Sequence, residues 1–190
     1  MKRPFNDEPV EELLPKVLKK DGTILDLRLK YIGNEGLIYL AGHEELKHLR
    51  ELNLERNDIT AEGIHALANS NVIMELEILH LERNHIGDAG VTMIAQSSNF
   101  QRLKILNLWK CNVGPKGASE IALSLYLSSL SSLDIAENNI GDEGAKALAE
   151  SPALTDLRSL EIVNNGLTEK GKTALQESQT LSKLEALVVG

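Results

Sequence analysis

The chain has 190 residues and a formal net charge of −8 at pH 7, and its single cysteine is Cys111. The length suits one domain with a sizeable core, and the negative charge makes nucleic acids and anionic membrane surfaces poor partners. One cysteine cannot form an internal disulfide and suits a reducing compartment. Residues 1–9 lack the apolar run of a secretory signal, and no segment approaches the ~20 apolar residues of a membrane helix. We therefore expect a cytoplasmic protein, or one exported without a conventional signal peptide.

The first predicted element is a helix over residues 9–20. Its apolar residues fall on one helical stripe, namely Val10, Leu13, Leu14, Val17 and Leu18. Pro15 should kink or split this helix, because proline has no amide hydrogen to donate. Leu13 lies 27 residues before Leu40, a spacing that recurs through the rest of the chain. We interpret residues 1–21 as an N-terminal capping helix of a repeat array, with a free amphipathic helix for a partner or membrane as the alternative.

From residue 22 to residue 190 the chain repeats every 27 residues. Leucine occupies one repeat position without a gap, at Leu25, Leu52, Leu79, Leu106, Leu133, Leu160 and Leu187. Glycine occupies another in the same way, at Gly36, Gly63, Gly90, Gly117, Gly144 and Gly171. Residues 22–190 are therefore interpreted as one repeat domain of six full copies, which begin at residues 22, 49, 76, 103, 130 and 157, followed by a final strand.

Each copy contains one predicted strand and one predicted helix. In the copy 49–75, Leu52 and Leu54 alternate with polar residues, which is the period-2 pattern of a strand. Ile64 and Leu67 then follow a helical spacing, and Thr60 is a residue type that caps helices. One copy cannot bury its apolar side alone, so the copies must stack, with parallel strands in one sheet and helices on the other side. The pattern predicts strands near residues 24–27, 51–54, 78–81, 105–108, 132–135, 159–162 and 186–189, each of the first six followed by a helix.

The segments 49–59 and 76–86 read Leu-x-x-Leu-x-Leu-x-x-Asn-x-Ile and resemble the leucine-rich repeat signature. The trailing pattern Gly-x-x-x-Leu-Ala-x-Ser in 63–70 and 144–151 is similar to the ribonuclease-inhibitor-like class. The resemblance implies an α/β fold, a right-handed leucine-rich repeat solenoid shaped as a horseshoe. Its parallel sheet lines the concave face and its helices form the convex face. It also implies that one repeat position forms a structural ladder of asparagine side chains, namely Asn57, Asn84, Asn138 and Asn165. Cys111 occupies the same position in the copy 103–129.

No arrangement of residues in the sequence predicts catalysis. The glycines recur once per copy, which favours close packing of adjacent copies over a phosphate-binding loop. The histidines have no metal-ligand spacing beyond that of the repeat. Cys111 occupies the position of a buried structural residue rather than that of a nucleophile. We therefore expect a protein without enzymatic activity, metal or cofactor.

The residues that differ between copies indicate a binding surface. Because strand side chains alternate, the residues between the core leucines face solvent on the concave sheet. Trp109, the only tryptophan, is expected to face water near Ile105 and Asn107 of its own copy and near Ile78 and His80 of the preceding copy. An aromatic side chain with apolar neighbours and polar rims is typical of a binding hot spot. The alternative is a surface aromatic side chain that only rests on its neighbours.

Acidic residues extend this predicted surface. Glu55 and Glu82 occupy the same repeat position in adjacent copies, and Asp134 extends the polar column further along the sheet. Like charges on neighbouring strands are mildly destabilising, so these carboxylates need a counter-charge. Either a partner brings a basic group to Glu55 and Glu82, or the adjacent column of Arg56, Arg83 and Lys110 neutralises these two carboxylates.

The predicted function is non-catalytic binding of a partner protein on the concave face. The alternatives are a microbial effector that binds in the same way inside a host cell, and a regulator of an enzyme such as a small GTPase, because similar repeats build the Ran GTPase-activating protein. Neither nucleic acid nor a membrane is an expected partner. The strand near 186–189 has no polar cap after it, which leaves self-association through the C-terminal edge as a further possibility. The predicted partner-binding residues are Trp109, Ile78, His80, Ile105, Asn107, Glu55, Glu82 and Asp134.

Overall fold

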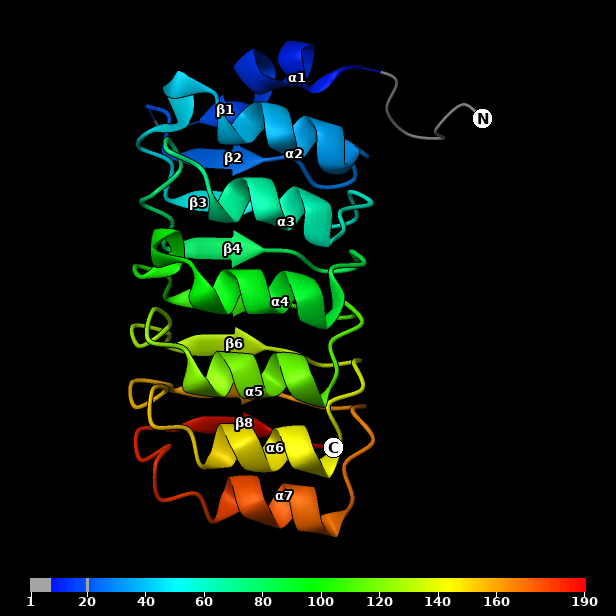
Figure 1. Ribbon diagram of the computed structural model, residues 1–190, viewed down its shortest axis with the longest axis vertical. Coiled ribbons are helices and arrows are strands. Elements are labelled where there is room, and N and C mark those ends of the chain that lie inside the picture. Colours follow the sequence, from blue (N-terminus) through cyan, green and yellow to red (C-terminus); the bar gives the residue numbers. More distant parts are fainter. Residues whose placement is uncertain (1–7, 20) are drawn as a thin grey trace.

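The protein is an α/β solenoid in which each 27-residue copy forms one coil (Figure 1). The computed structural model describes residues 8–19 and 21–190. Strands lie at all seven predicted positions: β2 Ile24–Asp26, β3 Glu51–Asn53, β4 Ile78–His80, β5 Ile105–Asn107, β6 Ser132–Asp134, β7 Ser159–Glu161 and β8 Ala186–Val188. They pair in parallel and in chain order, which confirms the predicted sheet.

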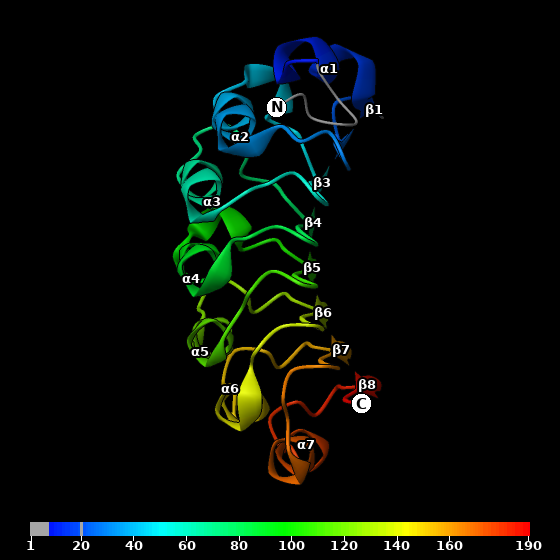
Figure 2. The ribbon, with the colours of Figure 1, turned by 90° about the vertical axis from the view of Figure 1, so that its right-hand side faces the viewer.

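One helix follows each of the strands β2 to β7 and packs on the outer side of the coil. These helices are α2 Gly33–Ala41, α3 Ala61–Ala68, α4 Gly87–Gln96, α5 Pro115–Leu123, α6 Gly141–Ala149 and α7 Glu169–Gln176. Thr60 and Thr168 cap α3 and α7 by accepting hydrogen bonds from the amides of Glu62 and Lys170. Pro115 is the first residue of α5, where no amide donor is needed. Figure 2 shows the strands along the inner side of a curve and the helices along its outer side.

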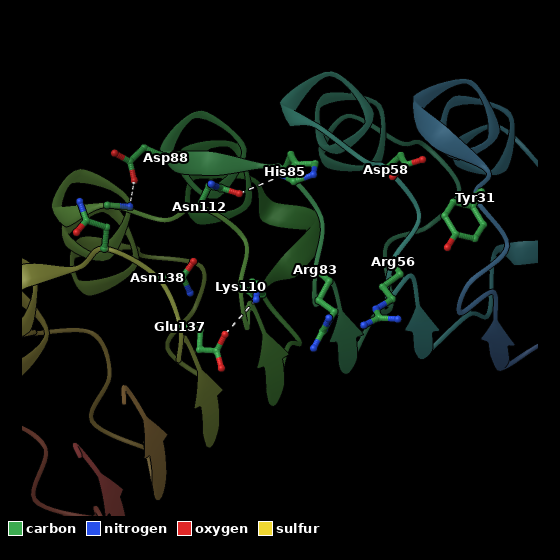
Figure 3. Close-up of a pocket in the computed structure, with 12 residues that line it drawn as sticks. Tyr31, Arg56, Asp58, Arg83, His85, Asp88, Lys110, Asn112, Glu137 and Asn138 are labelled. Carbon is green, nitrogen blue, oxygen red and sulfur yellow. Dashed lines mark hydrogen bonds and ion pairs between the residues drawn. The ribbon is translucent and has the colours of Figure 1, made fainter. Parts of the chain in front are cut away.

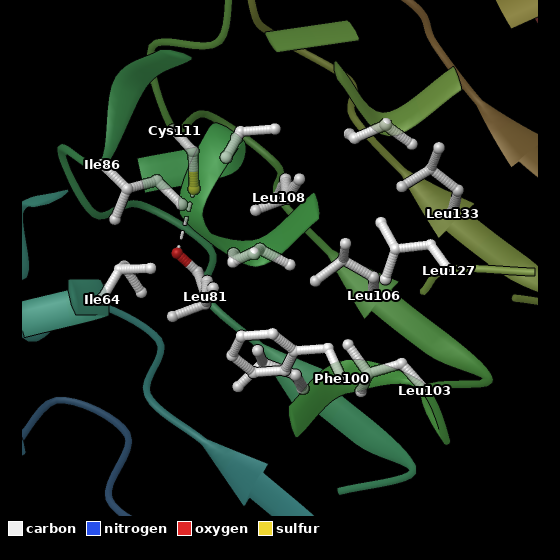
Figure 4. Close-up of a cluster of buried hydrophobic side chains, with 14 of the residues drawn as sticks. Ile64, Leu81, Ile86, Phe100, Leu103, Leu106, Leu108, Cys111, Leu127 and Leu133 are labelled. Carbon is white, nitrogen blue, oxygen red and sulfur yellow. Dashed lines mark hydrogen bonds between the residues drawn. The ribbon is translucent and has the colours of Figure 1, made fainter. Parts of the chain in front are cut away.

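The register of the sheet follows from the 27-residue period. Leu52 pairs with Leu79 across β3 and β4, and Leu106 pairs with Leu133 across β5 and β6. These leucines are buried, and they belong to one continuous apolar core with the return segments of each coil, where Phe100 is fully buried (Figure 4). Burial of a leucine or phenylalanine side chain stabilises the fold by about 1.5–3 kcal/mol. Stacked coils therefore share one core that no single coil could form.

A ladder of asparagine side chains ties neighbouring coils together beneath the loops. The Oδ1 of Asn84 accepts hydrogen bonds from the amides of Asn57 and Ile59 in the preceding coil, and its Nδ2 donates to the carbonyl of Leu54. Asn57, Asn84 and Asn165 are almost fully buried, which is tolerable because their polar atoms are satisfied. The structure thus gives these residues the role that the resemblance implied.

Cys111 occupies a rung of this ladder and has a structural environment. It is fully buried, and its Sγ donates to the carbonyl of Leu81 over 3.0 Å (Figure 4). Burial raises the pKa of the thiol to about 12, so the reactive thiolate is strongly disfavoured.

A second ladder lies at the other end of the helices, where each coil returns to the next strand. The hydroxyl of a serine donates to a carbonyl of the preceding coil, as from Ser70 to Ala41 and from Ser151 to Ala122. The same oxygen then accepts an amide from its own coil, as in the bond from Ile73 to Ser70. This accounts for the serine of the trailing repeat pattern.

The glycine in the first turn of each helix allows close packing. A Cβ on Gly90 would lie 2.9 Å from the Cβ of Ile86 and 3.5 Å from the Cα of Ala61 in the preceding coil. Any side chain at this position would push adjacent helices apart. The glycines therefore need no ligand to explain them.

The two ends of the sheet differ. The helix α1 Val10–Val17 packs its buried Leu13 and Leu14 on the first coil, and the strand β1 Leu18–Lys19 pairs antiparallel with β2. Pro15 lies inside α1 without splitting it, because the helix continues to Val17. The sequence did not predict β1. At the other end, β8 is the edge strand.

Candidate functional site

The predicted concave columns lie side by side on the sheet. Ile78 pairs with Ile105, and His80 pairs with Asn107, in directly adjacent strands about 4.8 Å apart. Asn107 in turn pairs with Asp134. All five residues are partly exposed, since they alternate with the buried core leucines. The structure therefore brings the predicted strand residues together on one surface, which we call the concave patch.

The polar residue at the end of several strands also has a local structural role. The Oδ1 of Asn107 accepts from the amide of Trp109 over 2.9 Å, and the Oδ1 of Asp134 accepts from the amide of Ala136 over 3.0 Å. Asn53 makes the same bond. Short side-chain acceptors of this kind stabilise turns at the end of a strand. Asn107 and Asp134 thus shape the loop as well as the surface, a role that the sequence analysis missed.

Trp109 is less open to water than the sequence predicted. Its side chain is half-buried, and the guanidinium of Arg83 lies over the ring at 4.3 Å from the ring centroid. A cation over an aromatic face is attracted by the ring quadrupole. One face of the indole is therefore covered within the chain, by a residue from the preceding coil.

The carboxylate of Glu82 contacts His80 and not the expected Arg83. Its Oε1 lies 3.2 Å from the Nδ1 of His80, and this hydrogen bond raises the pKa of His80. Its Oε2 is buried and has no hydrogen-bond partner among the described residues. Arg83 stacks on Trp109 instead of pairing with Glu82, so the predicted neutralisation by Arg83 is wrong.

The other two basic residues of the predicted column, Arg56 and Lys110, pair with different carboxylates. Arg56 forms an ion pair with Glu55, with 4.0 Å between Nε and Oε1, which confirms the predicted neutralisation of that carboxylate. Lys110 instead pairs with Glu137 at 3.3 Å. Asp134 has a raised pKa, because it is partly buried and near the carboxylates of Glu161 and Glu82. The concave patch therefore carries negative charge that the chain itself does not fully compensate.

A groove of about 790 Å³ lies beside the concave patch, along the loops that join strands to helices (Figure 3). Five consecutive coils contribute to its wall, from Tyr31 in the first to Asn139 in the fifth. We call this cavity the loop groove; its central basic residues are Arg56, Arg83 and Lys110. These three residues were expected only as counter-charges, and the sequence does not reveal the groove, because loop conformation decides where their side chains point.

The repeat pattern itself matches a known family. A family model described as "Leucine Rich repeat" matches residues 45–68, 74–95, 101–122 and 126–149. These matches fall on four successive coils of the sheet and helix array described above.

This chain is a leucine-rich repeat protein.

Its strand-and-helix coil is consistent with the ribonuclease-inhibitor-like class of that family. No curated protein sequence matches the chain.

Solved leucine-rich repeat structures resemble the chain at low sequence identity. The C-terminal domain of tropomodulin from Caenorhabditis elegans is 14% identical, with 93% of each chain covered and a TM-score of 0.49. A plant peptide hormone receptor, RGFR1 in complex with RGF2, is 18% identical with a TM-score of 0.44. The match covers 76% of this chain but spans only 21% of that receptor chain. An internalin from Listeria monocytogenes is 20% identical, with 95% of this chain and 69% of that chain covered and a TM-score of 0.30.

A small apolar patch on the return side was also missed by the sequence analysis. Leu123 and Leu125 are 67% and 86% exposed, and Tyr126 lies next to them at 36%. The repeat position of Leu125 holds Ser98 in the preceding coil and Pro152 in the following one. Comparing copies at this position, as was done for Trp109, would have found the patch.

Clusters of metal ligands and membrane-spanning helices are both absent from the residues that the structure describes. No group of three or more histidine, cysteine, aspartate or glutamate side chains in residues 8–19 and 21–190 could hold a metal ion. None of the helices found in these ranges is long and apolar enough to cross a membrane. The arrangement on the concave patch and the loop groove is suited to contact and charge complementarity.

Proposed function

We propose that this leucine-rich repeat protein binds a partner protein on its concave face, without catalysis. Leucine-rich repeats generally serve as protein-binding scaffolds, and the single observation that supports this surface is Trp109. The same repeat position holds Arg28, Glu55, Glu82, Ala136 and Val163 in the other full copies. The stacking of coils therefore does not require an aromatic residue there, which supports a role for Trp109 in binding.

The chemistry of the patch indicates the partner. This face combines Trp109 with the apolar pair Ile78 and Ile105 and with the carboxylates of Glu82 and Asp134. A partner that carries an apolar side chain beside a lysine or arginine would bury the two isoleucines and compensate the charge of the two carboxylates.

The test is affinity capture followed by calorimetry with the partner it identifies. Trp109→Ala is expected to weaken binding by about 2 kcal/mol, or roughly 30-fold, while the melting temperature changes little. The matched control is Arg102→Ala, on the opposite edge of the coil, where Arg102 pairs with Glu75 at 3.2 Å. Equal losses in both variants, or binding unaffected by Trp109→Ala, would overturn the assignment to the concave patch.

Self-association through the edge strand β8 is a second, independent proposal. The edge side chain Val188 is 45% exposed, and an unpaired strand edge can accept another strand. The other end of the same sheet does accept an antiparallel strand, β1. Sedimentation over a range of concentrations tests this, because Val188→Lys should reduce any dimer fraction. A monomer at all concentrations would refute it and leave the concave patch untouched.

A further inference from the structure

The loop groove carries a row of cations that the repeat does not require. Arg56, Arg83 and Lys110 occupy one repeat position in three consecutive coils, with φ angles of 53°, 56° and 56°. This left-handed region favours glycine and asparagine over long side chains. The next two coils place Glu137 and Asn164 at the same position and with the same conformation. The backbone therefore does not explain three successive basic residues.

Several charges that line the groove are already occupied within the chain. The Oδ1 of Asp88 accepts the amides of Gly114 and Gly117 over 2.6 and 2.9 Å, so this carboxylate caps the start of α5. The Nζ of Lys110 lies 3.3 Å from the Oε2 of Glu137. Because Asp88 and Glu137 are engaged in these contacts, neither carboxylate is expected to pair with Arg83.

Arg83, at the centre of the row, is differently placed. It forms no ion pair with any residue in the described ranges, and its guanidinium is held over the Trp109 ring. Stacking uses the flat face of a guanidinium and leaves its N–H edges available for a carboxylate. Figure 3 shows Arg83 and Arg56 side by side on neighbouring coils, with Lys110 beyond them.

We propose that the loop groove binds an acidic peptide segment in extended conformation. One carboxylate is held by Arg83, and neighbouring ones are held by Arg56 and Lys110 in exchange for their exposed ion pairs with Glu55 and Glu137. Adjacent coils are about 4.8 Å apart, and alternate side chains of an extended peptide are about 6.6 Å apart, a mismatch that flexible arginine and lysine stems can span. Trp109 is then a positioning residue for Arg83. This site adjoins the concave patch and does not depend on what binds there.

The wall of the groove favours a peptide over a nucleic acid. Asn112 and Asn139 supply amide groups that can bond to a peptide backbone. Asp58, also on the wall, and the net charge of −8 oppose a continuous phosphate chain, whereas separate carboxylates can avoid Asp58.

The test is titration of the whole chain with an acetylated, amidated hexapeptide of alternating glutamate and serine. Calorimetry reports affinity, and the fluorescence of the single Trp109 reports the site. We expect Arg83→Gln to weaken binding at least tenfold, and the matched control Arg102→Gln to leave it within twofold. A lysine–serine hexapeptide should bind at least tenfold more weakly than the glutamate peptide. Unchanged affinity in Arg83→Gln, or equal binding of the lysine peptide, overturns the proposal.

Three further arms complete the design. Trp109→Leu should weaken peptide binding severalfold and Trp109→Phe should restore it, because a phenyl ring can still hold the guanidinium; a loss that Trp109→Phe does not restore contradicts the positioning role. Ile105→Ala, on the concave patch, should leave peptide affinity unchanged, which separates failure here from failure of the concave site. Oligothymidylate binding as tightly as the glutamate peptide would show that the ligand class is wrong.

Discussion

The coils 76–102 and 103–129 are adjacent and have the same buried frame, yet they present different surfaces. Leu79 and Leu106 pair in register and both are fully buried. The coils diverge at many other positions, and three of these are informative: Glu82 becomes Trp109, Asn84 becomes Cys111, and Ser98 becomes Leu125. Two of these changes lie on the surface and one in the ladder. The comparison shows that the repeat fixes the coil while it leaves the surface free to vary, so function must be sought among the divergent positions.

The largest expected effect comes from breaking what the two coils share. Leu106→Ala removes a fully buried side chain and should cost about 2–5 kcal/mol of unfolding free energy. Because each coil is stabilised by its neighbours, the loss should extend to the coils on either side. Urea denaturation measures the loss, and hydrogen exchange measures its extent. Faster exchange confined to residues 103–129 would contradict the shared core.

The buried frame is the part that the sequence could predict. A period that places leucine at Leu52, Leu79 and Leu106 sets both the strand positions and the register, because a shift by one residue would expose every core leucine. The stacking of Arg83 on Trp109 was not predictable, since it depends on a left-handed backbone at Arg83. No periodicity reports the direction of a loop side chain.

The next largest expected effect comes from Cys111 in the asparagine ladder, where a substitution should raise the unfolding free energy instead of lowering it. The Oδ1 of Asn138 accepts amides from Cys111 and Val113 in the preceding coil, over 2.9 and 3.0 Å. Cys111 offers the coil before it a sulfur, which is a weak acceptor. Cys111→Asn should therefore supply the missing acceptor and stabilise the protein by about 1 kcal/mol.

Urea denaturation of Cys111→Asn beside Cys111→Ala measures this difference. The alanine variant removes the bond from Sγ to the carbonyl of Leu81 and should be less stable than the parent. If asparagine destabilises the chain as alanine does, the two coils are not interchangeable at this position. The native thiol should also resist alkylation, because burial raises its pKa to about 12.

A smaller effect tests whether Arg83 covers one face of the Trp109 ring. Arg83→Ala removes the cation from the ring and should cost no more than about 1 kcal/mol of stability. It should, however, increase quenching of Trp109 fluorescence by acrylamide, a neutral quencher, because one ring face becomes open. Arg56→Ala is the matched control from the neighbouring coil. Equal quenching in all three proteins would show that Arg83 does not cover the indole.

The smallest expected effect is a pH dependence of stability in coil 76–102, and it comes from His80. The same position in coil 103–129 holds Asn107, whose side chain does not titrate. The hydrogen bond to Glu82 raises the pKa of His80, with a further contribution from Glu51. A histidine whose pKa is raised on folding stabilises the protein fully below its unfolded pKa. That stability is lost as the pH rises through the folded pKa.

Glu82→Gln tests this pair. It should lower the unfolding free energy by up to about 1 kcal/mol near pH 5.5, where His80 is charged, and by less near pH 8. The control is Glu55→Gln in coil 49–75, where Asn53 stands at the histidine position, so its effect should depend little on pH in this range. NMR titration should also show a lower His80 pKa in Glu82→Gln. If both variants show the same pH dependence, His80 is not coupled to Glu82.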